Sequence, residues 1–478
     1  MKMSRFLVLI LVMALAIVLL PTAARAQDTM EPSVTVSDQV VTNSWVTIAS
    51  VYYNAPGFIV IHADSDGSIG PVIGYRQLSV GLNTNVEVWI DAAQATSTLY
   101  AMLHADTGTA GVYEFGTVDG ADGPVSDSAG NVVTPPFHVT VLNVKDQLPG
   151  DTYTAASVTV DAGSWLVIHS EADGAPGPVL GQTFVEAGIT TNVEVAIAAE
   201  GRTDNYWPML HVDDGVAGTY EFGTVEGADA PIAIDGKVAT VAVSTQPTIR
   251  ALPQIVTYGD SMAAMMEGMA PSFTAMSVLA AEPGFLVIHS EADGAPGPVA
   301  GYVAVPAGLS ENVVVELDPA NVTPNLWPML HVDTGESGVY EFGAVEGADG
   351  PVTNSAGDVV TFQVNASPAI HYEGEYLDAT TLKIHAALID GPGWLTIHAD
   401  NGSGEPGPVI GQTLLVPGLN HGVVITLDEA GITDTLFPML HYDDNTLGTY
   451  EFGAVEGADL PVFVGGAPVF GPLVVEGM

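Results

Sequence analysis

The sequence contains no cysteine and few basic residues. Among its 478 residues, 9 Lys and Arg stand against 56 Asp and Glu, which gives a formal net charge of -47. The absence of cysteine excludes disulfides, thiolate nucleophiles, cysteine zinc sites and iron–sulfur clusters. Because so acidic a surface repels phosphate groups, we expect no nucleic-acid partner.

The sequence also lacks the composition of a disordered chain. Its 53 Gly and 32 Pro together stay below the share of about 25–30% that is typical of low-complexity segments, and 47% of its residues are hydrophobic. A chain of this length is expected to form three or four domains of about 100–150 residues, each with its own core.

Residues 1–26 have the layout of a secretory signal peptide. Lys2 and Arg5 precede a fifteen-residue apolar run, and an A-x-A cleavage site ends at Ala26. The run is shorter than the roughly 20 residues that cross a bilayer, so we expect cleavage after Ala26 and membrane contact only if the segment stays uncleaved. The predicted location is extracellular or at the cell surface.

One sequence pattern recurs four times along the rest of the chain. Its first half is an apolar run that ends in a histidine and a carboxylate, as in PGFIVIHAD from Pro56. Its second half joins MLH, Tyr-Glu-Phe and Gly-Ala-Asp, as in WPMLHVDDGVAGTYEFGTVEGAD from Trp207. The first histidines of successive copies are 107, 120 and 109 residues apart, a period of whole domains rather than of solenoid units. We expect four domains: repeat 1 at 31–141, repeat 2 at 142–247, repeat 3 at 248–365 and repeat 4 at 366–478.

The local patterns predict β-strands throughout each repeat. Short runs rich in Val, Ile, Thr and aromatic residues are bounded by clusters of Gly, Pro, Asn and Asp. Ile59, Val60 and Ile61 are apolar on both strand faces, whereas Val86 and Val88 alternate with polar neighbours. The predicted fold class is all-β, with four tandem immunoglobulin-like β-sandwich domains after the signal peptide.

Repeat 3 carries a methionine-rich insertion near 258–270. Met262, Met265, Met266 and Met269 have the i, i+3, i+4, i+7 spacing of the apolar stripe of a short helix. This spacing favours a helix that packs its methionine face on a neighbouring domain. The alternative is a thioether site for Cu(I).

Eight of the twelve histidines belong to the repeat, two in each copy, and each is followed two positions later by a carboxylate. Residues i and i+2 share one face of a strand, so each imidazole has an acid on its own side. Two imidazoles with one or two carboxylates form a ligand set suited to zinc or copper. The candidate metal ligands are His62, Asp64, His104 and Asp106 in repeat 1, His169, Glu171, His211 and Asp213 in repeat 2, His289, Glu291, His331 and Asp333 in repeat 3, and His398, Asp400, His441 and Asp443 in repeat 4.

A structural role is the alternative for these histidines. Each would lie at a strand end with its ring half buried and its N–H held by the neighbouring acid. We favour this role, because the sequence does not show that the two strands of a copy are neighbours. Calcium is disfavoured, since the loop between Asp106 and Glu114 offers few oxygen ligands at alternate positions.

Enzyme signatures are absent or incomplete. Tyr258 to Met262 is similar to the nucleophile block of GDS-type esterases, but no histidine has the companion Asp three residues before it. No G-x-S-x-G, H-E-x-x-H, P-loop or dinucleotide glycine pattern occurs. Four similar domains without one distinguished copy indicate binding or scaffolding, so we expect a non-enzymatic protein without a cofactor.

The His-x-Asp after MLH, the Tyr-Glu-Phe and the Gly-Ala-Asp-x-Pro-Val resemble an uncharacterised domain family of secreted and surface proteins from haloarchaea and from bacteria such as Chloroflexi. The resemblance covers all four copies and implies an immunoglobulin-like fold and an extracellular address. It implies no activity and no site. The predicted function is a secreted or cell-surface binding and scaffold protein for an unknown extracellular ligand, and the alternative is a metal-binding protein with one His/carboxylate site per repeat.

Overall fold

The computed structural model describes residues 31–263 and 270–476. The predicted signal peptide and most of the predicted methionine stripe lie outside these residues. The described part of the insertion contains one helical turn, α1 (Asp260–Ala263). No helix in the described ranges is long and apolar enough to cross a membrane.

The same succession of strands appears in each repeat. Repeat 1 contains β1 (Ser33–Thr35), β2 (Gln39–Thr42), β3 (Trp45–Tyr53), β4 (Gly57–Ser65), β5 (Ser68–Leu78), β6 (Gly81–Trp89), the 3-10 turn η1 (Ala92–Gln94), β7 (Thr98–Ala105) and β8 (Pro136–Asn143). Repeat 2 contains β9 (Thr152–Val160), β10 (Ser164–Ala172), β11 (Ala175–Val185), β12 (Gly188–Ala196), β13 (Asn205–Val212), β14 (Ala233–Ile234), β15 (Lys237–Val238) and β16 (Val243–Ser244).

Repeats 3 and 4 follow the same order. Repeat 3 contains β17 (Thr248–Arg250), β18 (Ser272–Ala280), β19 (Gly284–Ala292), β20 (Ala295–Val305), β21 (Gly308–Glu316), η2 (Pro319–Asn321), β22 (Asn325–Val332) and β23 (Val364–Asn365). Repeat 4 contains β24 (Ala369–Tyr376), β25 (Thr381–Ile389), β26 (Gly393–Asp400), β27 (Pro406–Leu415), β28 (Gly418–Thr426), η3 (Glu429–Gly431), β29 (Leu436–Tyr442), β30 (Phe463–Val464), β31 (Ala467–Pro468) and β32 (Val474–Glu476).

Each repeat packs two sheets face to face. In repeat 3, the order β17-β18-β21 forms one sheet and β20-β19-β22-β23 the other, and repeat 4 pairs β28-β25-β24-β32 with β27-β26-β29. The core lies between the sheets, where Val46 and Ile48 of β3 meet Ile59 and Ile61 of β4 in repeat 1. Side chains at alternate positions of β3 are buried, as a strand with one solvated face requires. The prediction of an all-β chain of sandwich repeats is confirmed.

Strand β8 belongs to two repeats at once. It pairs with β7 of repeat 1, with β9 of repeat 2 and, in parallel, with β2. The expected boundary between residues 141 and 142 therefore falls inside a strand. Two side chains of β9 also reach repeat 1, since Ser157 Oγ donates to Ala92 O at 3.4 Å and Thr159 Oγ1 to Ala95 O at 2.8 Å.

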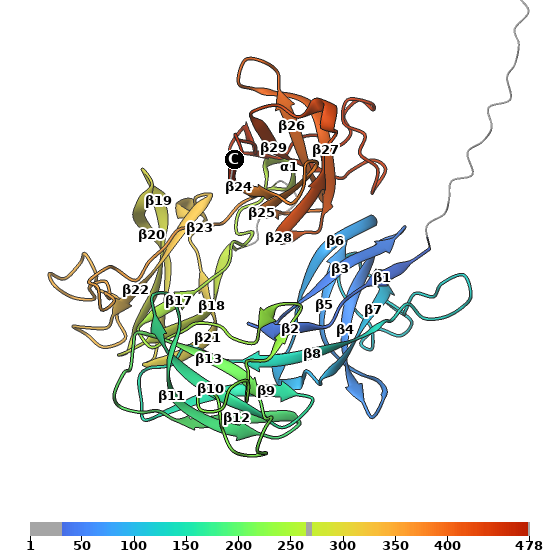
Figure 1. Ribbon diagram of the computed structural model, residues 1–478. Coiled ribbons are helices and arrows are strands. Elements are labelled where there is room, and N and C mark those ends of the chain that lie inside the picture. Colours follow the sequence, from blue (N-terminus) through green and yellow to red (C-terminus); the bar gives the residue numbers. More distant parts are fainter. Residues whose placement is uncertain (1–30, 264–269, 477–478) are drawn as a thin grey trace, which may run out of the picture.

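The four repeats are arranged in a ring, so that repeat 4 returns to lie beside repeat 1 (Figure 1). Repeat 2 meets repeat 3 through Arg250, whose Nε and Nη2 both lie 2.8 Å from the buried Asp146 carboxylate. Repeat 3 meets repeat 4 where Gly259 N donates to Asp390 Oδ2 at 2.7 Å. Repeat 4 meets repeat 1 through Ser79 Oγ, which donates to Leu415 O at 2.7 Å.

Candidate functional site

The two histidines of each repeat lie close together on neighbouring strands. In repeat 1, β4 carries His62 and β7 carries His104, and these strands pair antiparallel. A β-bulge at His62 interrupts the ladder to β5, and bulges re-aim side chains. The four pairs of ring centroids are 5.8, 5.7, 5.8 and 5.9 Å apart, with interplanar angles of 22°, 18°, 21° and 19°. We call these the imidazole pairs.

Backbone carbonyls fix the tautomer of every ring in the imidazole pairs. His62 Nδ1 lies 2.9 Å from Gly70 O, and His104 Nδ1 lies 2.6 Å from Asp122 O. The equivalent contacts in repeats 2 to 4 measure 2.7–2.8 Å. A carbonyl oxygen only accepts, so Nδ1 carries the proton and Nε2 holds a lone pair. The Nε2 atoms of all eight rings are buried and have no hydrogen-bond partner.

Burial favours the neutral form of seven imidazoles of the pairs. It is the largest cause that lowers the pKa of His62, His104, His169, His211, His331 and His398, while the hydrogen bond to a backbone carbonyl opposes the shift. For His441 burial lowers the pKa to about 4. The lowered pKa favours the neutral imidazole with a lone pair on Nε2, which is the form that binds a metal.

The predicted carboxylates do not join the imidazole pairs. In repeat 1, Asp64 accepts from Tyr100 Oη at 3.0 Å, and Asp106 closes the next loop by accepting from Gly111 N at 2.8 Å. Asp213, Asp333 and Asp443 close their loops in the same way, onto Gly218, Gly338 and Gly448. Glu291 accepts from Gln363, Asp400 accepts from the backbone of Gly402 and Gly404, and Glu171 is partly exposed at the end of its strand. Within the described ranges, no histidine of the imidazole pairs belongs to a group of three candidate metal ligands whose atoms all lie within 4.8 Å of one another.

The family comparison covers nearly the whole chain. The profile of a domain of unknown function (DUF7282) matches residues 32–140, 139–246, 264–367 and 368–476. The chain belongs to this family. The expectation of an uncharacterised repeat family is thereby confirmed. No curated protein matches the sequence.

Solved structures similar to this DUF7282 chain include alpha-2-macroglobulins. The native E. coli protein shares 10% identity at a TM-score of 0.18, covering 93% of this chain and 29% of that one. The Salmonella protein reacted with methylamine shares 10% at 0.17, covering 91% and 29%, and the elastase-activated E. coli protein shares 11% at 0.17, covering 86% and 42%. The DUF7282 chain thus spans less than half the length of these proteins.

A buried aspartate organises the loop beside each imidazole pair of the DUF7282 repeats. Asp122 is fully buried, its Oδ1 accepts from Thr107 N at 2.7 Å and its Oδ2 accepts from Glu114 N at 2.5 Å. Its backbone oxygen is the one that holds His104. Asp229, Asp349 and Asp459 make the same contacts in repeats 2 to 4. The sequence signal was the recurrent Gly-Ala-Asp, which sequence reasoning used only to recognise the repeat.

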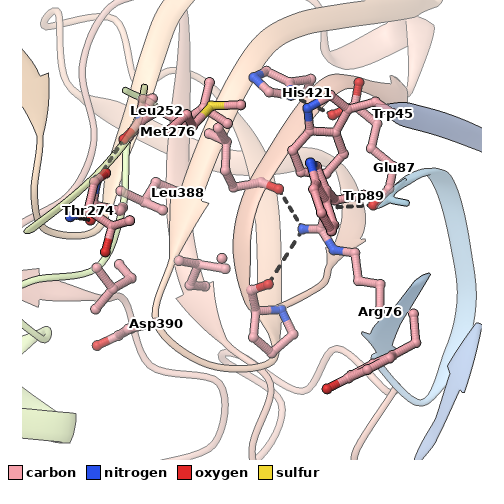
Figure 2. A pocket seen from close by; sticks show the side chains of 18 of the residues that line it. Trp45, Arg76, Glu87, Trp89, Leu252, Thr274, Met276, Leu388, Asp390 and His421 are labelled. Atoms are coloured by element: carbon pink, nitrogen blue, oxygen red, sulfur yellow. Dashed lines mark hydrogen bonds and ion pairs between the residues drawn. The ribbon is translucent and has the colours of Figure 1, made fainter. Parts of the chain in front are cut away.

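A pocket of about 620 Å³ opens where DUF7282 repeats 1, 3 and 4 meet (Figure 2). Repeat 1 contributes Trp45 and Trp89, which face each other across β3 and β6, together with Tyr75. Trp89 is 50% exposed and Tyr75 is 51% exposed, so large aromatic faces remain open to a ligand. The sequence could not indicate this pocket, because its walls come from strands more than 300 residues apart.

Polar groups line the junction beside these aromatic rings. Arg76 donates to Leu419 O at 2.5 Å and to Pro417 O at 3.5 Å, as the dashed lines in Figure 2 show. His421 Nδ1 lies 2.5 Å from Glu87 Oε2. Burial lowers the pKa of Arg76 to about 10, so the guanidinium is still charged at neutral pH. The junction therefore combines an open pocket with the contacts that close the ring.

Proposed function

We propose that this DUF7282 chain is a secreted or cell-surface binding and scaffold protein, non-enzymatic, whose ligand enters the pocket between repeats 1, 3 and 4. The observation that carries the proposal is the pocket itself, with its open aromatic faces and convergent polar groups. Its volume lies in the range of about 300–1,000 Å³ that is usual for small-ligand sites. The extracellular address is supported by the signal-peptide layout of residues 1–26.

The lining selects a ligand with a flat apolar face and polar edges. Trp45, Trp89 and Tyr75 offer rings that combine an apolar face with a polar tip. Asp390 adds a carboxylate from repeat 4, and its pKa is raised, mainly by burial. Neutral oligosaccharides have both features and are the probes of choice for an extracellular protein.

The test compares two tyrosines that occupy the same position in different repeats. Tyr75 pairs with Val60 and lines the pocket, whereas Tyr302 pairs with Val287, is equally exposed at 50%, and lies outside the pocket lining. Calorimetric titration of the full chain with a panel of neutral oligosaccharides should give binding that Tyr75→Ala weakens and Tyr302→Ala preserves. No binding across the panel, or an equal loss in both variants, would refute the pocket.

The imidazole pairs favour metal binding as a second function. A metal-ligating histidine commonly donates its other N–H to a backbone carbonyl, and every ring of the pairs does so. The unpartnered Nε2 atoms are the remaining ligand atoms. In this proposal a pair supplies two nitrogens, and Asp64 or Asp106 and their counterparts would have to leave their present hydrogen bonds to complete a four-ligand set.

Metal analysis of the full chain after dialysis tests this second function. Occupied pairs predict four equivalents of metal per chain, and His62→Ala with His104→Ala should remove one of the four. The variant pair is matched by His138→Ala, which changes an exposed histidine of repeat 1 outside the pairs. Fewer than one equivalent in the wild-type chain, or no loss in the paired variant, would contradict metal binding at the pairs.

A further inference from the structure

Two histidines and a glutamate meet on the outer face of repeat 4, away from its imidazole pair. His371 and Glu373 lie on β24 and His385 lies on β25. His371 Nε2 is 4.0 Å and His385 Nδ1 is 3.9 Å from the same oxygen, Glu373 Oε2. Within residues 31–263 and 270–476, they form the single group of three or more such side chains with ligand atoms within 4.8 Å of one another. We propose that these three side chains bind one divalent transition-metal ion of the zinc and copper class, a site that goes beyond the binding function proposed above.

A bulge in β24 creates the cluster. The ladder to β25 pairs His371 and resumes at Gly374, so Tyr372 and Glu373 together oppose His385. Tyr372 packs against the core of repeat 4, and its side chain therefore occupies the inner face. Glu373 is left on the outer face between the two imidazoles, whose ring centroids are 5.6 Å apart. Bulges of this kind re-aim side chains next to functional sites.

The ligand set and its spacing suit zinc or copper. Two imidazoles and one carboxylate are the ligands of zinc sites that keep a fourth position open. Metal bonds near 2 Å in a tetrahedron place ligand atoms about 3.3 Å apart, so the distances from Glu373 to the two imidazoles must shorten by about 0.6–0.7 Å. The side chains of His371, Glu373 and His385 are 55%, 52% and 33% exposed, so they are free to rotate by that amount. The strong negative charge of the chain attracts cations to its surface.

The site is a property of repeat 4 alone. The strand registers show which residues of repeats 1 to 3 are equivalent to the two histidines. The equivalents of His371 are Thr35, Asn143 and Arg250. The equivalents of His385 are Ala49, Ala156 and Met276. In those repeats the strand that corresponds to β24 ends at this position. Beyond it, the side-chain amide of a glutamine donates a hydrogen bond to a backbone oxygen of the next strand: Gln39 to Thr47, Gln147 to Thr154, and Gln254 to Thr274. In repeat 4 the strand continues past the bulge, and Glu375 pairs with Lys383 through the backbone. The site therefore predicts one equivalent per chain, whereas the imidazole pairs predict four.

Metal titration of the full, tag-free chain tests the proposal. After chelator treatment, Zn²⁺ and Cu²⁺ are titrated in competition with a chromophoric chelator, and Cu²⁺ spin-resonance spectra report the number of bound nitrogens. The expected result is one equivalent with micromolar or tighter affinity and splitting from two nitrogens. His371→Ala with His385→Ala should weaken this equivalent by at least about 100-fold, and Glu373→Gln by about 10-fold, since even outer partners of a metal site contribute 10- to 100-fold.

Two controls keep the outcome decisive. His138→Ala, another exposed histidine, should bind as the wild-type chain does, and circular dichroism should show that every variant is folded. An equivalent that persists in the His371→Ala, His385→Ala variant but vanishes in His62→Ala, His104→Ala belongs to an imidazole pair. Loss of one equivalent in the His371→Ala, His385→Ala variant supports this site whether or not the imidazole pairs also bind metal. A wild-type affinity weaker than millimolar, or the same number of equivalents with and without His371 and His385, would overturn the proposal.

Discussion

Replacing Arg76 by Ala should weaken the closure of the ring between repeats 1 and 4. The guanidinium reaches across the junction to the carbonyls of Leu419 and Pro417, and it also holds Glu87 O within its own repeat at 3.0 Å. The bond to Leu419 is short and charged, whereas the 3.5 Å contact to Pro417 is at the limit of a hydrogen bond. Loss of Arg76 therefore removes one strong bond between the repeats.

The expected magnitude follows from that single bond. A hydrogen bond to a charged group contributes about 1.5–3 kcal/mol. Because each 1.4 kcal/mol is a factor of ten, the equilibrium constant for opening should rise about 10- to 150-fold. The bonds of Ser79 to Leu415 and of Asn85 to Gly422 and the contact of His421 with Glu87 remain, so closure is weakened and not abolished.

The lack of cysteine makes the measurement direct, because introduced cysteines are the only ones. Spin labels at Ser68→Cys and Glu405→Cys, exposed positions of the corresponding hairpins in repeats 1 and 4, report the distance across the junction. The urea concentration at which the labels separate should fall in Arg76→Ala. It should stay unchanged in Arg202→Ala, whose partner Asp151 is 96% exposed in repeat 2. An unchanged midpoint in Arg76→Ala would refute the assignment of ring closure to this residue.

Three further predictions concern the repeats themselves. Asp122→Ala removes two hydrogen bonds to a buried carboxylate and should destabilise repeat 1 by about 3–5 kcal/mol, seen as faster hydrogen exchange at the amides of Thr107 and Glu114; wild-type exchange rates there would contradict it. Gly181→Ala would place a Cβ against the backbone oxygen of Ala196, so the unfolding midpoint of repeat 2 should fall by the equivalent of about 1–3 kcal/mol, and an unchanged midpoint would disprove the close approach. Burial lowers the pKa of His441 to about 4, so the unfolded state binds the proton more readily, and the free energy of unfolding of repeat 4 should fall by about 3 kcal/mol between pH 6.5 and 4. The pKa of Asp443 is raised, mainly by burial, to about 6, so this carboxyl adds a similar amount to the free energy of unfolding as the pH falls. Wild-type repeat 4 should thus lose less stability in acid than Asp443→Asn, as measured by hydrogen exchange in β29, and equal pH profiles would contradict these shifts.

Several structural features followed from local sequence. Ile59 to Ile61 are apolar on both strand faces, which is typical of a central strand, and β4 pairs with both β5 and β7. The repeated pattern indicated four similar sandwiches, since alternation and turn residues act within a few residues of each other. The same local spacing predicted an acid beside each histidine. In the structure Asp106 accepts a hydrogen bond from the loop amide of Gly111 and does not contact the imidazole as a ligand partner.

The remaining features depend on which strands become neighbours. His62 approaches His104 through the β4–β7 pairing and a bulge at His62. Neither feature can be predicted from the residues that flank the two histidines. The cluster of His371, Glu373 and His385 was missed because only recurrent histidines drew attention, although His371-Tyr372-Glu373 repeats the His-x-acid spacing.

The sequence by itself determined the absence of thiol chemistry, the scarcity of basic residues, the fourfold repeat and the β character of each copy. These are properties of composition and of patterns a few residues long. Only the tertiary structure decided that the chain closes into a ring, that Trp45 and Trp89 face Leu419 and His421 across a shared pocket, and that eight Nε2 atoms are left without partners. Such contacts join residues tens to hundreds of positions apart, and their energies depend on burial and distance, which arise only when the sheets pack.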